Sequence, residues 1–148
     1  FSHPPVFTCE EARQVAPDLP GADTKNLFLR DGKGKRHFLV TVPDHKSVNL
    51  KALSAALEVK NLTFASPERL LRFLGVTPGA VTLLGVFNDS ERAVEVVLDT
   101  ELWDSDAILA HPLVNTETLS IPTPGLMRFL ELSGHPPVRL SVPQPEAA

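Results

Sequence analysis

The chain has few of the residues that carry metal or covalent chemistry. Its one cysteine, Cys9, cannot form an internal disulfide, and no second cysteine or histidine cluster has the spacing of a zinc site. Cys9 precedes Glu10 and Glu11, and their negative charge disfavours the reactive thiolate. The sequence therefore predicts no metal, no cofactor and no cysteine nucleophile.

Several sequence motifs of common protein classes are also missing. No apolar run approaches the roughly 18 residues that a membrane helix needs. Ser54, Ser90 and Ser105 lack the flanking glycines of a serine-hydrolase elbow, and no segment has the Walker spacing of a nucleotide-binding loop. We expect a soluble, cytoplasmic protein without membrane or DNA partners.

Strong positive charge is absent as well. The 14 Lys and Arg residues face 18 Asp and Glu residues, which gives a formal net charge of -4. This balance argues against a general nucleic-acid binder, so any RNA contact must be local. The 148 residues fit one domain, which we assign to 1–142, and 143–148 is expected to be a disordered end because it has no apolar period. A monomer is expected.

Short strand patterns interleaved with helix patterns make up most of the chain. Alternating or continuous apolar runs predict strands over 27–30, 37–42, 61–64, 81–84, 93–98, 107–110, 117–121 and 138–142. Helical spacing and capping residues predict helices after 8–11 and over 49–57, 66–74 and 123–130. This order predicts an α/β or α+β domain with a curved mixed β-sheet and flanking helices.

A turn places Lys25 and Asn26 at the start of the first strand. Because strand alternation begins directly after Lys25, its ammonium is positioned at a strand end, where it can hold an ester or offset charge on a carbonyl oxygen. The alternative is a solvated lysine flanking a strand. Alternation turns Asn26 to the opposite face, and a structural role explains it equally well.

The loop of residues 75–80 is a second candidate. Glycines let the backbone approach a ligand and present N–H groups to an oxyanion or phosphate, which makes Gly75, Pro78, Gly79 and Ala80 candidate substrate-binding residues, although the motif alone is weak. The alternative is a helix stop followed by a tight turn.

Two further residues are candidates for contacts with the substrate. His111, in a turn with Pro112, is near its neutral form at pH 7 and can accept a proton or hydrogen-bond a hydroxyl group. A purely structural turn is the alternative. Asp99 closes a strand and could orient His111 or a water, although an aspartate there often caps a helix.

In order and spacing, the segments 21–30, 75–80, 88–89, 96–99 and 111–115 resemble the YbaK/ProRS-associated group of aminoacyl-tRNA editing domains. The resemblance covers nearly the whole chain. Segments 3–8 and 24–29 are most similar to those of the free-standing alanyl-tRNA(Pro) deacylases. The resemblance implies a critical lysine at Lys25, an ester-binding loop at Gly79 and Ala80, and a histidine-proline turn at His111.

The same resemblance implies a trans-editing hydrolase that deacylates mischarged Ala-tRNA(Pro). Its partner would be the acceptor end of tRNA(Pro), with prolyl-tRNA synthetase or an elongation factor as transient partners. Two alternatives stay open. One is a deacylase of Cys- or Ser-tRNA, because pocket volume cannot be read from the sequence, and the other is a non-catalytic module that binds tRNA or the synthetase.

Overall fold

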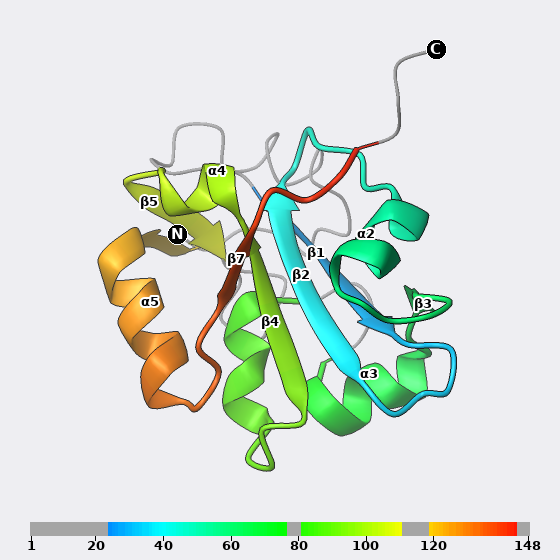
Figure 1. Cartoon of the computed structure of the whole chain (residues 1–148). Helices are drawn as coiled ribbons and strands as arrows, with labels where there is room; N and C mark the ends of the chain where they lie inside the picture. The colour runs from blue at the N-terminus through cyan, green and yellow to red at the C-terminus, as the bar shows by residue number, and fades with distance from the viewer. Residues whose placement is uncertain (1–23, 77–80, 111–118, 145–148) are drawn as a thin grey trace.

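The computed structural model describes residues 24–76, 81–110 and 119–144. Its main sheet has five strands in the order β3-β1-β2-β4-β7, and β5 pairs with β6 in a separate two-stranded sheet. Helices lie on both sides of the main sheet (Figure 1). The predicted mixed sheet with flanking helices is therefore confirmed.

The centre of the sheet is the predicted hairpin. Strands β1 (Thr24–Arg30) and β2 (His37–Pro43) are antiparallel, with Thr24 opposite Pro43 and Arg30 opposite His37. At the outer side of β1 lies β3 (Thr63–Phe64), which is shorter than the predicted strand. All seven residues of β2 are buried, so the hairpin requires cover on both faces.

The other half of the sheet is parallel. Strand β4 (Val94–Asp99) runs parallel to β2, and β7 (Val138–Leu140) runs parallel to β4 at the edge of the sheet. The C-terminal ends of β2 and β4 therefore lie at the same end of the sheet as the start of β1. This end carries the residues considered below.

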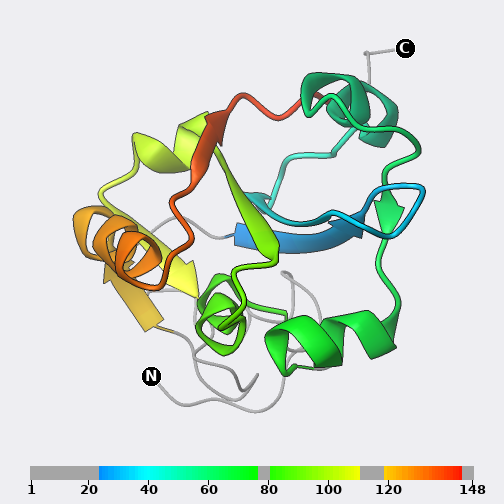
Figure 2. The same cartoon turned by 60° about the horizontal axis from the view of Figure 1, so that its bottom comes forward.

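The helices begin and end where their capping residues predict. Helix α2 (Leu50–Ala56) starts at Asn49, whose side chain accepts a bond from Ala52 N, and α3 (Pro67–Leu74) starts at Ser66. Gly75 ends α3 with a φ of 68°, in the left-handed region that favours glycine. Figure 2 shows α2 and α3 on opposite sides of the sheet.

The sheet separates two hydrophobic clusters. Alternate residues of β1 and β2 point to opposite faces, so Phe28 and Leu39 join one cluster and Leu29 and Val40 join the other. The first cluster lies against α3, α5 (Thr123–Leu132) and the short 3-10 helix η2 (Leu83–Asn88). The second packs on α2 through Leu53, as the sequence predicted.

The predicted strand over 81–84 is wrong. The chain instead forms η2, which begins after Thr82, whose hydroxyl accepts a bond from Leu84 N at 3.3 Å. Gly85 is buried so close to α3 that an added Cβ would lie 3.3 Å from Leu74 Cβ. A four-residue apolar run is too short to show a period that distinguishes a buried strand from a buried helix. The sequence pattern alone therefore could not identify η2.

The C-terminal half also contains a helix that the sequence did not predict. Strands β5 (Ala107–Ala110) and β6 (Leu119–Pro122) are antiparallel as expected, but α4 (Thr100–Trp103) precedes them.

The backbone oxygen of Pro143, in the segment expected to be disordered, accepts a bond from Asn49 N at 2.8 Å. The predicted first helix lies outside the described residues, among which no helix is long and apolar enough to span a membrane.

Candidate functional site

Lys25 occupies the second position of β1, opposite Val42 of β2. Its side chain is half-buried, and by alternation it shares the face of Leu27 and Leu29, on the α2 side of the sheet. Among the described residues, no carboxylate lies within ion-pair distance of its ammonium. The backbone position of Lys25 is thus fixed by a strand of the main sheet.

Asn26 points to the other face, as the alternation predicted. Its amide oxygen accepts a bond from Thr41 Oγ1 at 2.7 Å, and its amide nitrogen donates to Val81 O across 3.5 Å. Val81 directly follows the 75–80 loop in the sequence. Asn26 therefore links β1 to β2, and it also contacts Val81, the first residue after that loop.

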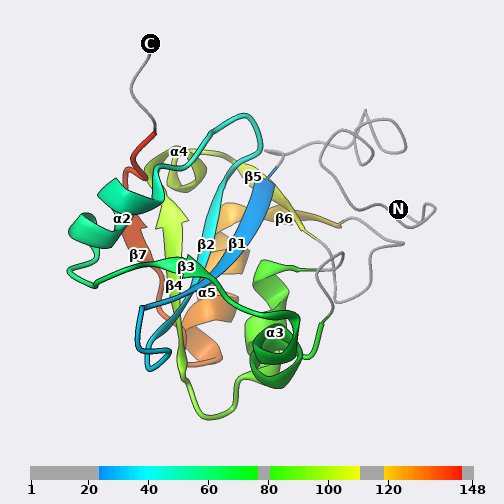
Figure 3. The same ribbon diagram turned by 90° about the vertical axis from the view of Figure 1, so that its right-hand side faces the viewer.

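Thr24 makes the corresponding contact to β5. Its hydroxyl donates to Leu109 O at 3.0 Å, and Leu109 is two residues before His111 in the sequence. Figure 3 shows β5 beside the start of β1. The start of β1 is thus the place where the described flanks of both predicted loops meet.

The loop residues are described only at their flanks. Pro78, Gly79, Ala80 and His111 lie outside the described residues, whereas Val76 is buried on one side of the 77–80 segment. On the other side Thr82 is fully buried, so both flanks of the segment are anchored in the core.

Gly75 itself takes the helix-stop role that the sequence left as the alternative. Its N–H donates to Leu71 O at 2.9 Å, and an added Cβ would lie 2.8 Å from Asn88 Nδ2. The same Asn88 nitrogen donates to Leu74 O at 2.9 Å. Gly75 therefore fixes the direction in which the loop leaves α3.

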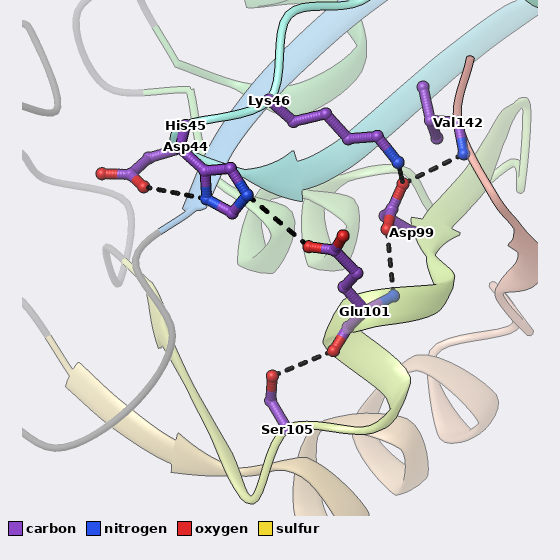
Figure 4. A network of polar contacts seen from close by, with 7 residues as sticks. All are labelled: Asp44, His45, Lys46, Asp99, Glu101, Ser105 and Val142. Atoms are coloured by element: carbon purple, nitrogen blue, oxygen red, sulfur yellow. Dashed lines mark hydrogen bonds and ion pairs between the residues drawn. The ribbon is translucent and has the colours of Figure 1, made fainter. Parts of the chain in front are cut away.

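Asp99 is fully buried at the end of β4 (Figure 4). One carboxylate oxygen accepts bonds from Lys46 Nζ at 2.6 Å and Val142 N at 3.0 Å. The other accepts from Glu101 N at 3.0 Å and caps α4, which is the helix-cap role weighed from the sequence. Asp99 thus ties the segment after β2 to the C-terminal segment, at the same end of the sheet as Lys25.

Sequence reasoning gave no role to His45. Its side chain is 68% exposed, and its two ring nitrogens lie 4.0 Å from Asp44 Oδ1 and 3.7 Å from Glu101 Oε2 (Figure 4). The available signal was position, because His45 lies two residues after the end of β2, the strand that pairs with β1. It adds a titratable group to this end of the sheet.

The described groups suit electrostatic and hydrogen-bonding chemistry. Within the described ranges no three His, Cys, Asp or Glu side chains are grouped to hold a metal ion. The Lys25 ammonium, held by a strand, can polarise a carbonyl or hold an ester oxygen, while the Asn26 amide on the opposite face is engaged with Thr41 and Val81. The arrangement therefore fits hydrolysis of an activated ester.

Comparison with known proteins agrees with this chemistry. A family model described as the aminoacyl-tRNA editing domain matches residues 3–129. The chain is 45% identical over 143 residues to prolyl-tRNA synthetase associated domain-containing protein 1 of Danio rerio, covering 95% of this chain and 77% of that protein. It is 37% identical over 137 residues to the prolyl-tRNA editing protein ProX of Acetoanaerobium sticklandii, covering 91% and 82%.

A solved structure supports the fold. The crystal structure of a candidate trans-editing enzyme for prolyl tRNA synthetase superimposes with a TM-score of 0.69 at 22% identity, covering 95% of this chain and 83% of the other. At that identity the likeness bears on the fold alone. Together with the family match over most of the sequence, it completes the assignment: the chain belongs to the aminoacyl-tRNA editing domain family.

Proposed function

We propose that the protein is a trans-editing hydrolase that removes alanine from mischarged Ala-tRNA(Pro). The observation that carries this proposal is the meeting of three segments at the start of β1. Lys25 stands there, Asn26 contacts the residue after the 75–80 loop, and Thr24 contacts β5 just before His111. The name of the ProX relative, a prolyl-tRNA editing protein, supports the choice of tRNA.

In the proposed reaction a water attacks the carbonyl carbon of the aminoacyl ester. The Lys25 ammonium and backbone N–H groups of Gly79 and Ala80 stabilise the negative oxygen of the tetrahedral intermediate. The bond to the ribose oxygen then breaks, and the ribose hydroxyl and free alanine are released. His111 holds a ribose hydroxyl, or it takes the proton of the water and passes it to the leaving ribose oxygen.

Selectivity in this proposal comes from the size of the amino-acid pocket. One methylene changes binding in an apolar pocket by only about 1–3 kcal/mol, so attraction alone would discriminate weakly. Steric exclusion of a larger ring can exceed that value, and it leaves the smaller alanine ester free to react. Glycine would fit but lose the methyl contact.

The direct test uses one tRNA(Pro) charged in turn with alanine, glycine, serine, cysteine and proline. We expect alanine to be released fastest, glycine more slowly, and proline essentially not at all. Release rates are measured with the purified protein under single-turnover conditions, with spontaneous hydrolysis as the baseline.

Two outcomes would refute parts of the proposal. If serine or cysteine is released much faster than alanine, the substrate assignment is wrong while the hydrolase assignment stands. If no ester is released above baseline although the tRNA binds, the protein is a binding module and not an editing enzyme.

A further inference from the structure

The turn end of the β1–β2 hairpin and its neighbours carry a large share of the chain's positively charged residues. Six of the 14 Lys and Arg residues lie there, in a protein whose formal net charge is -4. We call this the hairpin surface, and its cations are Arg30, Lys33, Lys35, Arg36, Lys60 and Arg69. Lys33, Lys35 and Lys60 are exposed.

The turn that presents these lysines is internally fixed. Asp31 Oδ1 accepts bonds from Lys35 N at 2.8 Å and Arg36 N at 3.1 Å, and Gly34 takes a φ of 67°. The bond from Arg36 N is the main cause that lowers the pKa of Asp31, so its carboxylate stays ionised and keeps closing the turn. The lysines therefore extend from a rigid base.

Two neighbouring segments attach further cations to the hairpin. Gly32 N donates to Lys60 O at 2.8 Å, which brings Lys60 beside the turn. Arg69 of α3 donates to Gly34 O at 3.1 Å and contacts His37 Nε2 at 2.9 Å. The hairpin, the segment before β3 and α3 thus form one surface, at the lower right of Figure 1.

Two of the carboxylates near this surface, Asp31 and Glu95, are occupied. Asp31 is bound within the turn, and Glu95 is held by a double hydrogen bond from Arg36 at 2.8 and 2.9 Å. Glu58 and Glu68 are the other acidic residues of these segments. Among the described residues, no carboxylate lies within 4.0 Å of the ammonium groups of Lys33, Lys35 and Lys60.

A buried histidine, His37, lies beneath the surface. Burial is the main cause that lowers its pKa; the charge of Arg69 lowers the pKa further, the charge of Asp31 raises it, and the charges of Arg72 and Arg30 lower it by smaller amounts. A neutral His37 can accept the hydrogen bond from Arg69, so the guanidinium is held in place.

The position of the surface limits what it can bind. It lies at the opposite end of β1 from Lys25, and a seven-residue strand spans roughly 20 Å. A phosphate next to the ester could not reach both places. An extended polyanion could reach both, and an RNA backbone is the polyanion that an aminoacyl-tRNA editing domain must accept.

We propose that the hairpin surface binds backbone phosphates of the tRNA body while the aminoacyl end lies at the start of β1. This inference rests on the proposed function only in taking tRNA as the substrate. Local positive charge would allow an acidic protein to hold RNA in one orientation without binding nucleic acids in general.

The test compares two triple variants with the same change in charge. One is Lys33→Ala with Lys35→Ala and Lys60→Ala on the hairpin surface. The control is Lys51→Ala with Arg128→Ala and Arg139→Ala, which removes three exposed cations elsewhere. Binding of uncharged tRNA(Pro) is followed by fluorescence anisotropy between about 50 and 200 mM salt, the range over which phosphate contacts weaken strongly.

We expect the hairpin variant to bind at least tenfold more weakly at low salt, with a slope of log Kd against log salt that is smaller by about 2–3. The control should lose less than about threefold. Equal losses in the two variants would overturn the proposal, because binding would then follow overall charge alone.

A second readout separates this surface from the ester site. With alanyl-tRNA(Pro), the hairpin variant should have a raised KM and an unchanged kcat, and it should hydrolyse a short aminoacyl-CCA fragment as the wild type does. A loss of activity on the fragment would contradict a contact with the tRNA body. If no ester is hydrolysed by any form, the proposed function fails, and the anisotropy result still decides the role of the surface.

Discussion

Lys46 and Lys25 lie at the same end of the sheet, yet their surroundings differ completely. Lys46 lies three residues after the end of β2 in the sequence. The structure buries its side chain to 5% exposure against the fully buried Asp99. A contact across 53 positions of the sequence fixes this role, and no local pattern around Lys46 indicates it.

We predict that Lys46→Ala destabilises the protein by about 3–5 kcal/mol, because it leaves the buried Asp99 carboxylate without a partner. Lys51→Ala, at an exposed position of α2, should change stability by less than about 0.5 kcal/mol. Denaturant unfolding of both variants measures the difference. Equal stabilities would show that water reaches and solvates Asp99.

At the scale of elements, capping residues were the most reliable sequence signal. Asn49, Ser66 and Gly75 define the ends of helices because each satisfies backbone groups within a few residues. The errors of sequence-based prediction concern elements whose conformation depends on packing. Thr82 caps η2 and Asp99 caps α4 through nearby N–H groups, but η2 also packs on α3, and α4 contacts β2 and β7.

We predict opposite effects of alanine at two glycines. Gly75→Ala should destabilise by about 1 kcal/mol or more, because its φ is 68° and the new Cβ would meet the Asn88 side chain. Gly125→Ala, in α5 with no atom within 4 Å of the new Cβ, should stabilise by about 0.5–1 kcal/mol.

Thermal unfolding and deacylation rates of both variants make the comparison. Gly75→Ala should also slow deacylation, because Gly75 sets the direction of the 77–80 segment, whereas Gly125→Ala should not. A Gly75→Ala protein with wild-type stability and rate would show that the loop has no fixed starting geometry.

At the scale of the whole molecule, the sheet order was out of reach of the sequence. Alternation in β1 predicted the opposite directions of Lys25 and Asn26 correctly, because it depends only on neighbouring residues. The parallel pairing of β2 with β4 and the contact of β5 with Thr24 join residues that are far apart in the chain. The same holds for the cations of the hairpin surface, which come from three segments.

In the proposed function, ester hydrolysis takes place at the start of β1, and it depends most on Lys25. The most direct measurement is the single-turnover rate of Ala-tRNA(Pro) deacylation by Lys25→Ala, with Lys51→Ala as control and thermal unfolding of both proteins beside it. We predict a loss of about 10²–10³-fold for Lys25→Ala, the size seen when one donor to an oxyanion is removed, with little change in melting temperature. A folded Lys25→Ala protein that deacylates Ala-tRNA(Pro) within about threefold of the wild-type rate would contradict the account.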